Sequence, residues 1–143
     1  MVRGALIRLP TQVDSQLRFL IVDDMPAMRS IVRNMLEELG FARIEDAEDG
    51  ETAWQLIRQS VADPEQAFGF VISDWNMPGM SGVDLLRAVR AFPHTRELPF
   101  LMVTAEGDQS HVNEALRAGV TDYVVKPFNS TQLREKIDQA MAL

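Results

Sequence analysis

Short apolar runs alternate with amphipathic segments along most of the chain, and this alternation restricts the possible folds more than any other feature of the sequence. The runs contain β-branched and large apolar residues with no polar–apolar alternation, which is typical of strands covered on both faces. They occupy 19–22, 70–72, 100–103 and 123–125, and a weaker run at 43–47 fits between the first two. The sequence therefore predicts five strands of a parallel sheet.

The segments between these runs have apolar residues at helical spacing. The first extends from Met28 to Leu39 and is followed by Gly40, a helix-stop residue. Later segments centre on 53–57, 85–89, 112–116 and 133–141. Asn129 or Ser130 is expected to cap the last helix. Five strands alternating with five helices predict an α/β fold, a three-layer sandwich with right-handed crossovers.

Length and composition exclude several classes of protein. The 143 residues suit one domain, and 46% apolar content is enough for a continuous core. A net charge of -7 argues against a nucleic-acid partner, and the absence of cysteine excludes disulfides and thiolate sites. No apolar run is long enough to span a membrane and no signal peptide is evident, so we expect a cytoplasmic protein without a membrane partner. Residues 1–16 lack periodicity, which predicts an N-terminal extension before a domain at 17–143.

The predicted strands end in polar residues. The acidic pair Asp23 and Asp24 follows the first run, Asp74 follows the central run, and Thr104 and Lys126 follow the last two. Ligands of parallel α/β sheets bind outside the carboxyl ends of the strands. The sequence therefore brings three carboxylates, a hydroxyl and a lysine to one edge.

This combination suits a metal ion and a phosphoryl group. Three adjacent carboxylates repel one another unless a cation intervenes, and oxygen ligands favour Mg²⁺. Lys126 is one of two lysines in the chain, and lysine commonly binds phosphate. Asp74 is the candidate nucleophile for an aspartyl-phosphate, which leaves Asp23 and Asp24 to hold the metal. Any one of these residues alone could be a helix cap or a turn, but their conjunction favours phosphoryl chemistry.

The strings around these positions resemble a known family, the response-regulator receiver domains, and within it the single-domain chemotaxis type. The resemblance starts near residue 17 and extends to the C-terminus through FLIVDD, MRSIVRNMLEELGF, AEDG, GFVISDWNMPGMSG, LPFLMVTAE and YVVKPF. It implies a flavodoxin-like (βα)5 fold with strand order 2-1-3-4-5. It also implies that Asp74 accepts a phosphoryl group from a sensor histidine kinase of the CheA type.

Further roles are implied by the same resemblance. Asp24, Asp74 and the backbone carbonyl of Asn76 would bind Mg²⁺, with Asp23 acting mostly through a water. Lys126 would bind the phosphoryl group and precede a cis proline.

The family also implies a switch. Thr104 would move toward the phosphoryl group and Tyr123 would follow it inward. Asn76 and Glu106 match positions that tune how fast the phosphoryl group is lost.

Output would come from the fourth helix, fifth strand and fifth helix, a face that includes Asp108, Gln109, Val112, Tyr123 and Lys136. The partners expected there are a downstream effector protein, with the flagellar motor switch as one candidate, and a phosphatase. The flagellar type has lysines where this chain has Asp108 and Gln109, and a further lysine at the position of Gln139. Losing these positive charges weakens the expectation of motor binding. We expect a monomer.

Two alternatives stay open. A Mg²⁺-dependent phosphatase also passes through an aspartyl-phosphate, but that class places an acid two residues after the nucleophile, where this chain has Asn76. The second alternative is a receiver that is not phosphorylated and acts as a scaffold. All the expected phosphorylation positions are present, which favours the phosphoacceptor over the scaffold.

Overall fold

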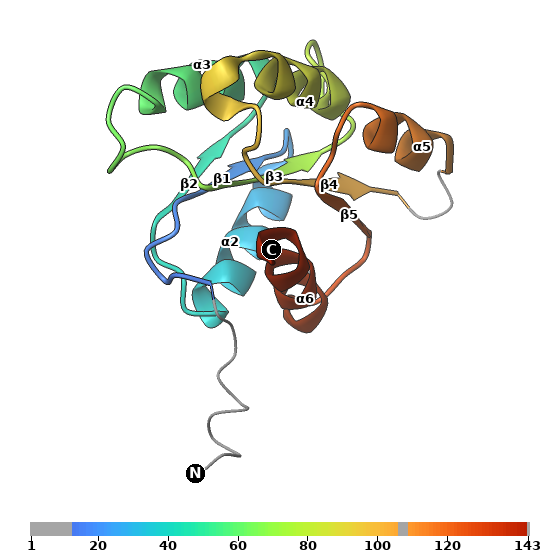
Figure 1. Cartoon of the computed structure of the whole chain (residues 1–143). Coiled ribbons are helices and arrows are strands. Elements are labelled where there is room, and N and C mark those ends of the chain that lie inside the picture. Colours follow the sequence, from blue (N-terminus) through green and yellow to red (C-terminus); the bar gives the residue numbers. More distant parts are fainter. Residues whose placement is uncertain (1–12, 106–108, 143) are drawn as a thin grey trace.

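The computed structural model describes residues 13–105 and 109–142, which form a five-stranded parallel sheet between two layers of helices (Figure 1). The strands are β1 (Phe19–Val22), β2 (Ile44–Ala47), β3 (Phe70–Asp74), β4 (Phe100–Thr104) and β5 (Asp122–Val125). Their order is β2-β1-β3-β4-β5, and every pair is parallel. The predicted fold class and strand order are confirmed.

Five α-helices of the described region cover the two faces of the sheet. They are α2 (Pro26–Glu38), α3 (Gly50–Ser60), α4 (Gly82–Ala91), α5 (Gln109–Arg117) and α6 (Ser130–Met141). Figure 1 shows α2 and α6 on one face and α3, α4 and α5 on the other. A short 3₁₀ helix, Pro93–Thr95, which the apolar pattern does not predict, precedes β4.

The core consists of two apolar clusters separated by the sheet. Leu20 and Val71 belong to the cluster under α3 and α4, whereas their neighbours Phe19 and Phe70 belong to the cluster under α2 and α6. All four side chains are fully buried. Because both faces of these strands are covered, both sets of alternating side chains are apolar, which explains the continuous apolar runs.

The helix ends follow the predicted signals. Gly40 and Gly119 have φ angles of 98° and 92°, in the left-handed region that glycine enters most readily. Asn129 caps α6, because its side chain accepts from the N–H of Gln132 while the Gln132 side chain accepts from the N–H of Asn129.

The segment before β1 lies against the loop between α3 and β3. Arg43 donates to the backbone carbonyls of Gln16, at 3.3 Å, and Glu65, at 2.6 Å. Arg18 lies 4.2 Å from the ring centroid of Phe68. These contacts tie residues 13–18 to the end of the domain opposite the carboxyl ends of the strands. In the described part of the chain no helix combines the length and apolarity needed to cross a membrane.

Candidate functional site

The polar residues predicted at the strand ends meet at the carboxyl edge of the sheet. Asp23 follows β1, Asp74 ends β3, Thr104 ends β4 and Lys126 follows β5. The backbone ladder continues past the apolar residues, since the N–H of Lys126 donates to the carbonyl of Thr104 at 2.9 Å. The parallel register therefore brings these four side chains, two carboxylates, a hydroxyl and an amine, to the same edge of the sheet, as the sequence predicts.

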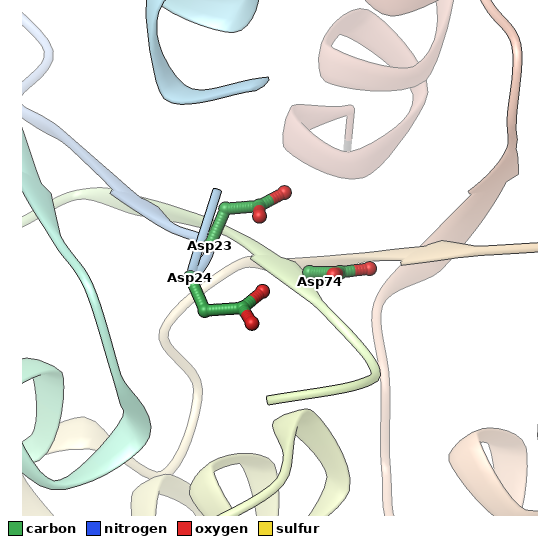
Figure 2. Close-up of side chains that lie close together, drawn as sticks. All are labelled: Asp23, Asp24 and Asp74. Atoms are coloured by element: carbon green, nitrogen blue, oxygen red, sulfur yellow. The ribbon is translucent and has the colours of Figure 1, made fainter. Parts of the chain in front are cut away.

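Asp23, Asp24 and Asp74 form a carboxylate cluster (Figure 2). One oxygen of each lies within 4.8 Å of the others. Asp23 and Asp74 are buried, with 5% and 7% of their surface exposed, and Asp24 is exposed. The cluster thus has two carboxylates out of water and one at the mouth of the site.

Asp23 is held by local hydrogen bonds. Its side chain accepts from the N–H of Met25 at 2.9 Å, and its carbonyl accepts from Arg29 Nη1 at 2.7 Å. Burial raises the pKa of the Asp23 carboxyl above its usual value, and the charges of Asp74 and Asp24 act in the same direction. The Met25 N–H and Lys126 lower this pKa but do not cancel the increase. A cation bound among the three acids would offset their mutual repulsion and favour the ionised form of Asp23.

Asp74 is fixed by two contacts to one oxygen. Its Oδ1 lies 3.1 Å from Lys126 Nζ and accepts from the N–H of Trp75 at 3.0 Å. The Lys126–Pro127 peptide bond is cis, as the family resemblance implies. Since Lys126 is one-third exposed while Asp74 is buried, the ammonium group approaches the acid from the solvent side.

Thr104 presents an unused polar atom. Its Oγ1 is buried, and no hydrogen-bond partner for it lies among the described residues. A buried hydroxyl without a partner is costly, and an incoming acceptor would satisfy it. A phosphoryl oxygen on Asp74 is a group of that kind.

An open pocket of about 300 Å³ borders the cluster, lined by Asp24, Asn76, Met77, Pro78 and Ser81. Asn76 is exposed there, in the loop between β3 and α4. Asp24, at the mouth of the cluster, therefore has access to solvent on this side.

The donor set fits a hard divalent cation. Three carboxylates supply hard oxygen atoms, and two of them are buried together with only one lysine nearby. Oxygen-only sites with open positions suit Mg²⁺, which keeps several waters and binds through a small number of carboxylates.

The backbone between β3 and α4 is packed tightly behind Asp74. The N–H of Gly82 donates to the carbonyl of Trp75 at 2.9 Å. A Cβ at Gly82 would lie 2.2 Å from the carbonyl oxygen of Asp74. The start of α4 approaches the end of β3 this closely because residue 82 has no side chain.

The residues of the predicted output face differ in their exposure to solvent. Gln109 is exposed and Tyr123 is half-buried, but Val112 is only 7% exposed. Val112 therefore packs α5 against the domain and contributes little accessible surface, since it lies on the inward side of the amphipathic helix. Lys136 Nζ lies 3.4 Å from Asp122 Oδ1 and 5.5 Å from the Tyr123 ring centroid. Its charge is thus partly paired within the protein.

Two predicted residues, Glu106 and Asp108, lie outside the described residues. Sequence reasoning also missed a contact at this edge: the rings of Trp75 and His111 stack with centroids 4.1 Å apart and planes 13° apart. The residues are far apart in the sequence, so no local pattern signals this pair.

Comparisons with known proteins agree with the fold. The chain matches the response regulator receiver domain family over residues 19–138 and belongs to that family. It is 48% identical over 123 residues to the chemotaxis protein CheY of Pseudomonas aeruginosa, covering 86% of this chain and 94% of that protein. It is 44% identical over 127 residues to chemotaxis protein CheY-3 of Vibrio cholerae, covering 89% and 93%.

A solved structure shows the same likeness. Chemotaxis response regulator CheY4 of Vibrio cholerae superposes with a TM-score of 0.77 at 31% identity, covering 87% of this chain and 98% of that one. The chain is therefore a receiver domain homologous to chemotaxis response regulators.

Proposed function

We propose that the protein is a single-domain phosphoacceptor switch in which Asp74 receives a phosphoryl group from a CheA-like sensor histidine kinase. The main support is the pairing of Asp74 Oδ1 with Lys126 Nζ, at 3.1 Å, inside a cluster of three carboxylates. A lysine at this place can neutralise the charge that a phosphoryl group brings. Residues 17–143 form the receiver domain in this proposal, and residues 1–16 precede it as an extension. The protein acts in the cytoplasm as a monomer.

The chemistry is a transfer between two nucleophiles. A carboxylate oxygen of Asp74 attacks the phosphorus of a phosphohistidine, a P–O bond forms, and the P–N bond to the kinase imidazole breaks. The leaving imidazole takes up a proton from solvent. Water later attacks the phosphorus of the aspartyl-phosphate, which restores the carboxylate and releases inorganic phosphate. The protein thus catalyses only its own phosphorylation and dephosphorylation.

Mg²⁺ is the expected cofactor. Asp23, Asp24, Asp74 and the backbone carbonyl of Asn76 would hold it, with Asp23 acting mostly through a water. Bound there, Mg²⁺ supplies positive charge that offsets the carboxylates and the phosphoryl oxygens. Lys126 holds the phosphoryl group from the other side, and Thr104 Oγ1 donates to one of its oxygens. Asn76 and Glu106 tune the rate of hydrolysis.

The signal leaves through another protein. Thr104 and Tyr123 respond to the phosphoryl group, and α5, β5 and α6 present the face that binds a downstream effector. Accessible residues of that face include Gln109, Tyr123 and Lys136. The pairing of Lys136 with Asp122 lowers the net positive charge available there, which argues against a strongly acidic partner such as the flagellar motor switch.

Intact mass spectrometry tests the proposal. A small-molecule phosphodonor should add one phosphoryl mass to the wild-type protein, only with Mg²⁺, and none to Asp74→Asn. Glu48→Gln, which removes an exposed acid that does not belong to the cluster, should be modified like wild type. Equal labelling of Asp74→Asn and wild type would refute the assignment of the nucleophile. Absence of labelling with both a phosphodonor and a phosphorylated histidine kinase would favour a scaffold.

A further inference from the structure

The stack of His111 on Trp75 joins α5 to the residue that follows the phosphoacceptor. The ring centroids are 4.1 Å apart and the planes differ by 13°, so the rings lie face to face. Trp75 is 6% exposed, and His111, half-buried in the first half of α5, covers its ring.

The backbone of Trp75 is itself bonded to the phosphorylation site. Its N–H donates to Asp74 Oδ1 at 3.0 Å and also to the carbonyl of Val103 at 3.1 Å. Its carbonyl accepts from the N–H of Gly82 at the start of α4. A change in the charge or position of the Asp74 carboxylate therefore acts directly on Trp75.

Other residues of α5 contact the core and α4. Val112 and Ala115 are its buried residues, and Glu114 pairs with Arg87 of α4 at 2.8 Å. Half of the Arg87 side chain is exposed, and an ion pair in such a setting holds a helix only weakly. Figure 1 shows α5 at the β4–β5 end of the sheet, on the same side as α3 and α4. Among these contacts, the stack is the one that reaches the residue next to Asp74.

We propose that the His111 ring couples the state of Asp74 to α5 through its stack on Trp75, and this inference rests on the proposed function. When Asp74 carries a phosphoryl group, the negative charge on its Oδ1 falls and Lys126 gains the phosphoryl oxygens as partners, so the hydrogen bond from the Trp75 N–H to Oδ1 changes. Trp75 shifts, and the His111 ring that stacks on it must move with it or lose the contact. An aromatic pair of this kind changes the equilibrium between two positions of a helix by about two- to tenfold. His111 is thus a positioning residue for the output helix and does not take part in the transfer.

The test uses the full chain and two substitutions at one position. His111→Phe keeps a ring over Trp75, whereas His111→Asn keeps a polar side chain but removes the ring. Beryllium trifluoride with Mg²⁺ serves as the phosphoryl mimic on Asp74, and ¹⁹F NMR reports whether it binds. Amide hydrogen exchange of residues 109–117 reports on α5.

In wild type and His111→Phe, the mimic should change the exchange rates of α5 by about threefold or more, in the range that the loss of an aromatic pair produces. In His111→Asn, the adduct should still form but the change in α5 should fall to less than about a third of the wild-type effect. An unchanged α5 response in His111→Asn, or no α5 response in wild type that binds the mimic, would overturn the coupling. No adduct on wild type would instead overturn the proposed function, and the coupling with it.

Discussion

Asp23→Asn should stabilise the protein in the absence of Mg²⁺. Asparagine is nearly isosteric and its carbonyl oxygen can still accept from the Met25 N–H, so the main change is the loss of one buried negative charge. Two unit charges 4.8 Å apart, the outer limit within this cluster, repel by about 3.5 kcal/mol at an effective dielectric constant of about 20. Asp23 has two such neighbours, Asp74 and Asp24, and one opposing cation, Lys126.

Lys126 therefore offsets about one of the two repulsions that act on Asp23, and solvent at the exposed Asp24 screens part of the other. We expect the free energy of unfolding at neutral pH to rise by about 1–3 kcal/mol.

The sign of the pH dependence follows from the raised pKa of Asp23. The folded protein binds this proton more tightly than the unfolded chain does, so wild-type stability is lost as pH rises from the unfolded pKa through the folded pKa. The advantage of Asp23→Asn should accordingly vanish at acidic pH, below the unfolded pKa.

Urea unfolding with EDTA, across a pH series, measures this difference, and urea leaves the ionic strength unchanged. Excess Mg²⁺ should reverse the order, because wild type gains binding free energy that the variant has partly lost. Glu48→Gln makes the same change of charge outside the cluster and should alter stability by less than about 0.5 kcal/mol. Equal or lower stability of Asp23→Asn in EDTA at neutral pH would refute the electrostatic account of the site.

Three further substitutions test other parts of the account. Gly82→Ala should lower the free energy of unfolding, measured in urea, by about 1–3 kcal/mol, because the new Cβ would lie 2.2 Å from the Asp74 carbonyl oxygen. Alanine stabilises a helix at a glycine position where there is space for its side chain, so a more stable variant would contradict this packing. Asp49→Ala should lower the free energy of unfolding by about 1 kcal/mol at neutral pH, because it removes the side chain that caps the Thr52 N–H. This hydrogen bond lowers the pKa of Asp49, so the loss of stability should become smaller as pH falls through that lowered pKa. A loss of stability that does not depend on pH would contradict a charged cap. Lys126→Met should still bind Mg²⁺ in a fluorescence titration of Trp75 but be phosphorylated about tenfold more slowly or worse. Lys136→Met, which removes the other lysine of the chain, is the control for this rate. A normal rate of phosphorylation in Lys126→Met would refute the role of the lysine.

The fold and the site's composition could be predicted because both depend on regular geometry. Parallel strands covered on both faces need continuous apolar runs, so β1 has the boundaries that its run indicates. Each strand of such a sheet ends at the same edge, so the residue after each run locates the site. β3 and β4 extend beyond their apolar runs to Asp74 and Thr104, because ladder hydrogen bonds involve the backbone and tolerate polar side chains.

What could not be predicted depends on contacts between distant elements. The stack of His111 on Trp75 and the pairing of Lys136 with Asp122 join residues from different helices and strands, and neither follows a local pattern. Val112 is a different case. Its spacing from Ala115 and Leu116 indicates an amphipathic helix, and the same spacing already implies that part of this set faces the core; Val112 and Ala115 are buried and Leu116 is exposed.

Mapping the phosphorylated residue distinguishes Asp74 from the other two acids of the cluster as the phosphoacceptor. Protein treated with a phosphodonor and Mg²⁺ is reduced with borohydride, which converts an aspartyl-phosphate to homoserine, and its peptides are then sequenced by mass spectrometry. We expect homoserine at position 74 and aspartate retained at positions 23 and 24. Homoserine at either of those positions, or at none in protein that has gained a phosphoryl group, would contradict this expectation.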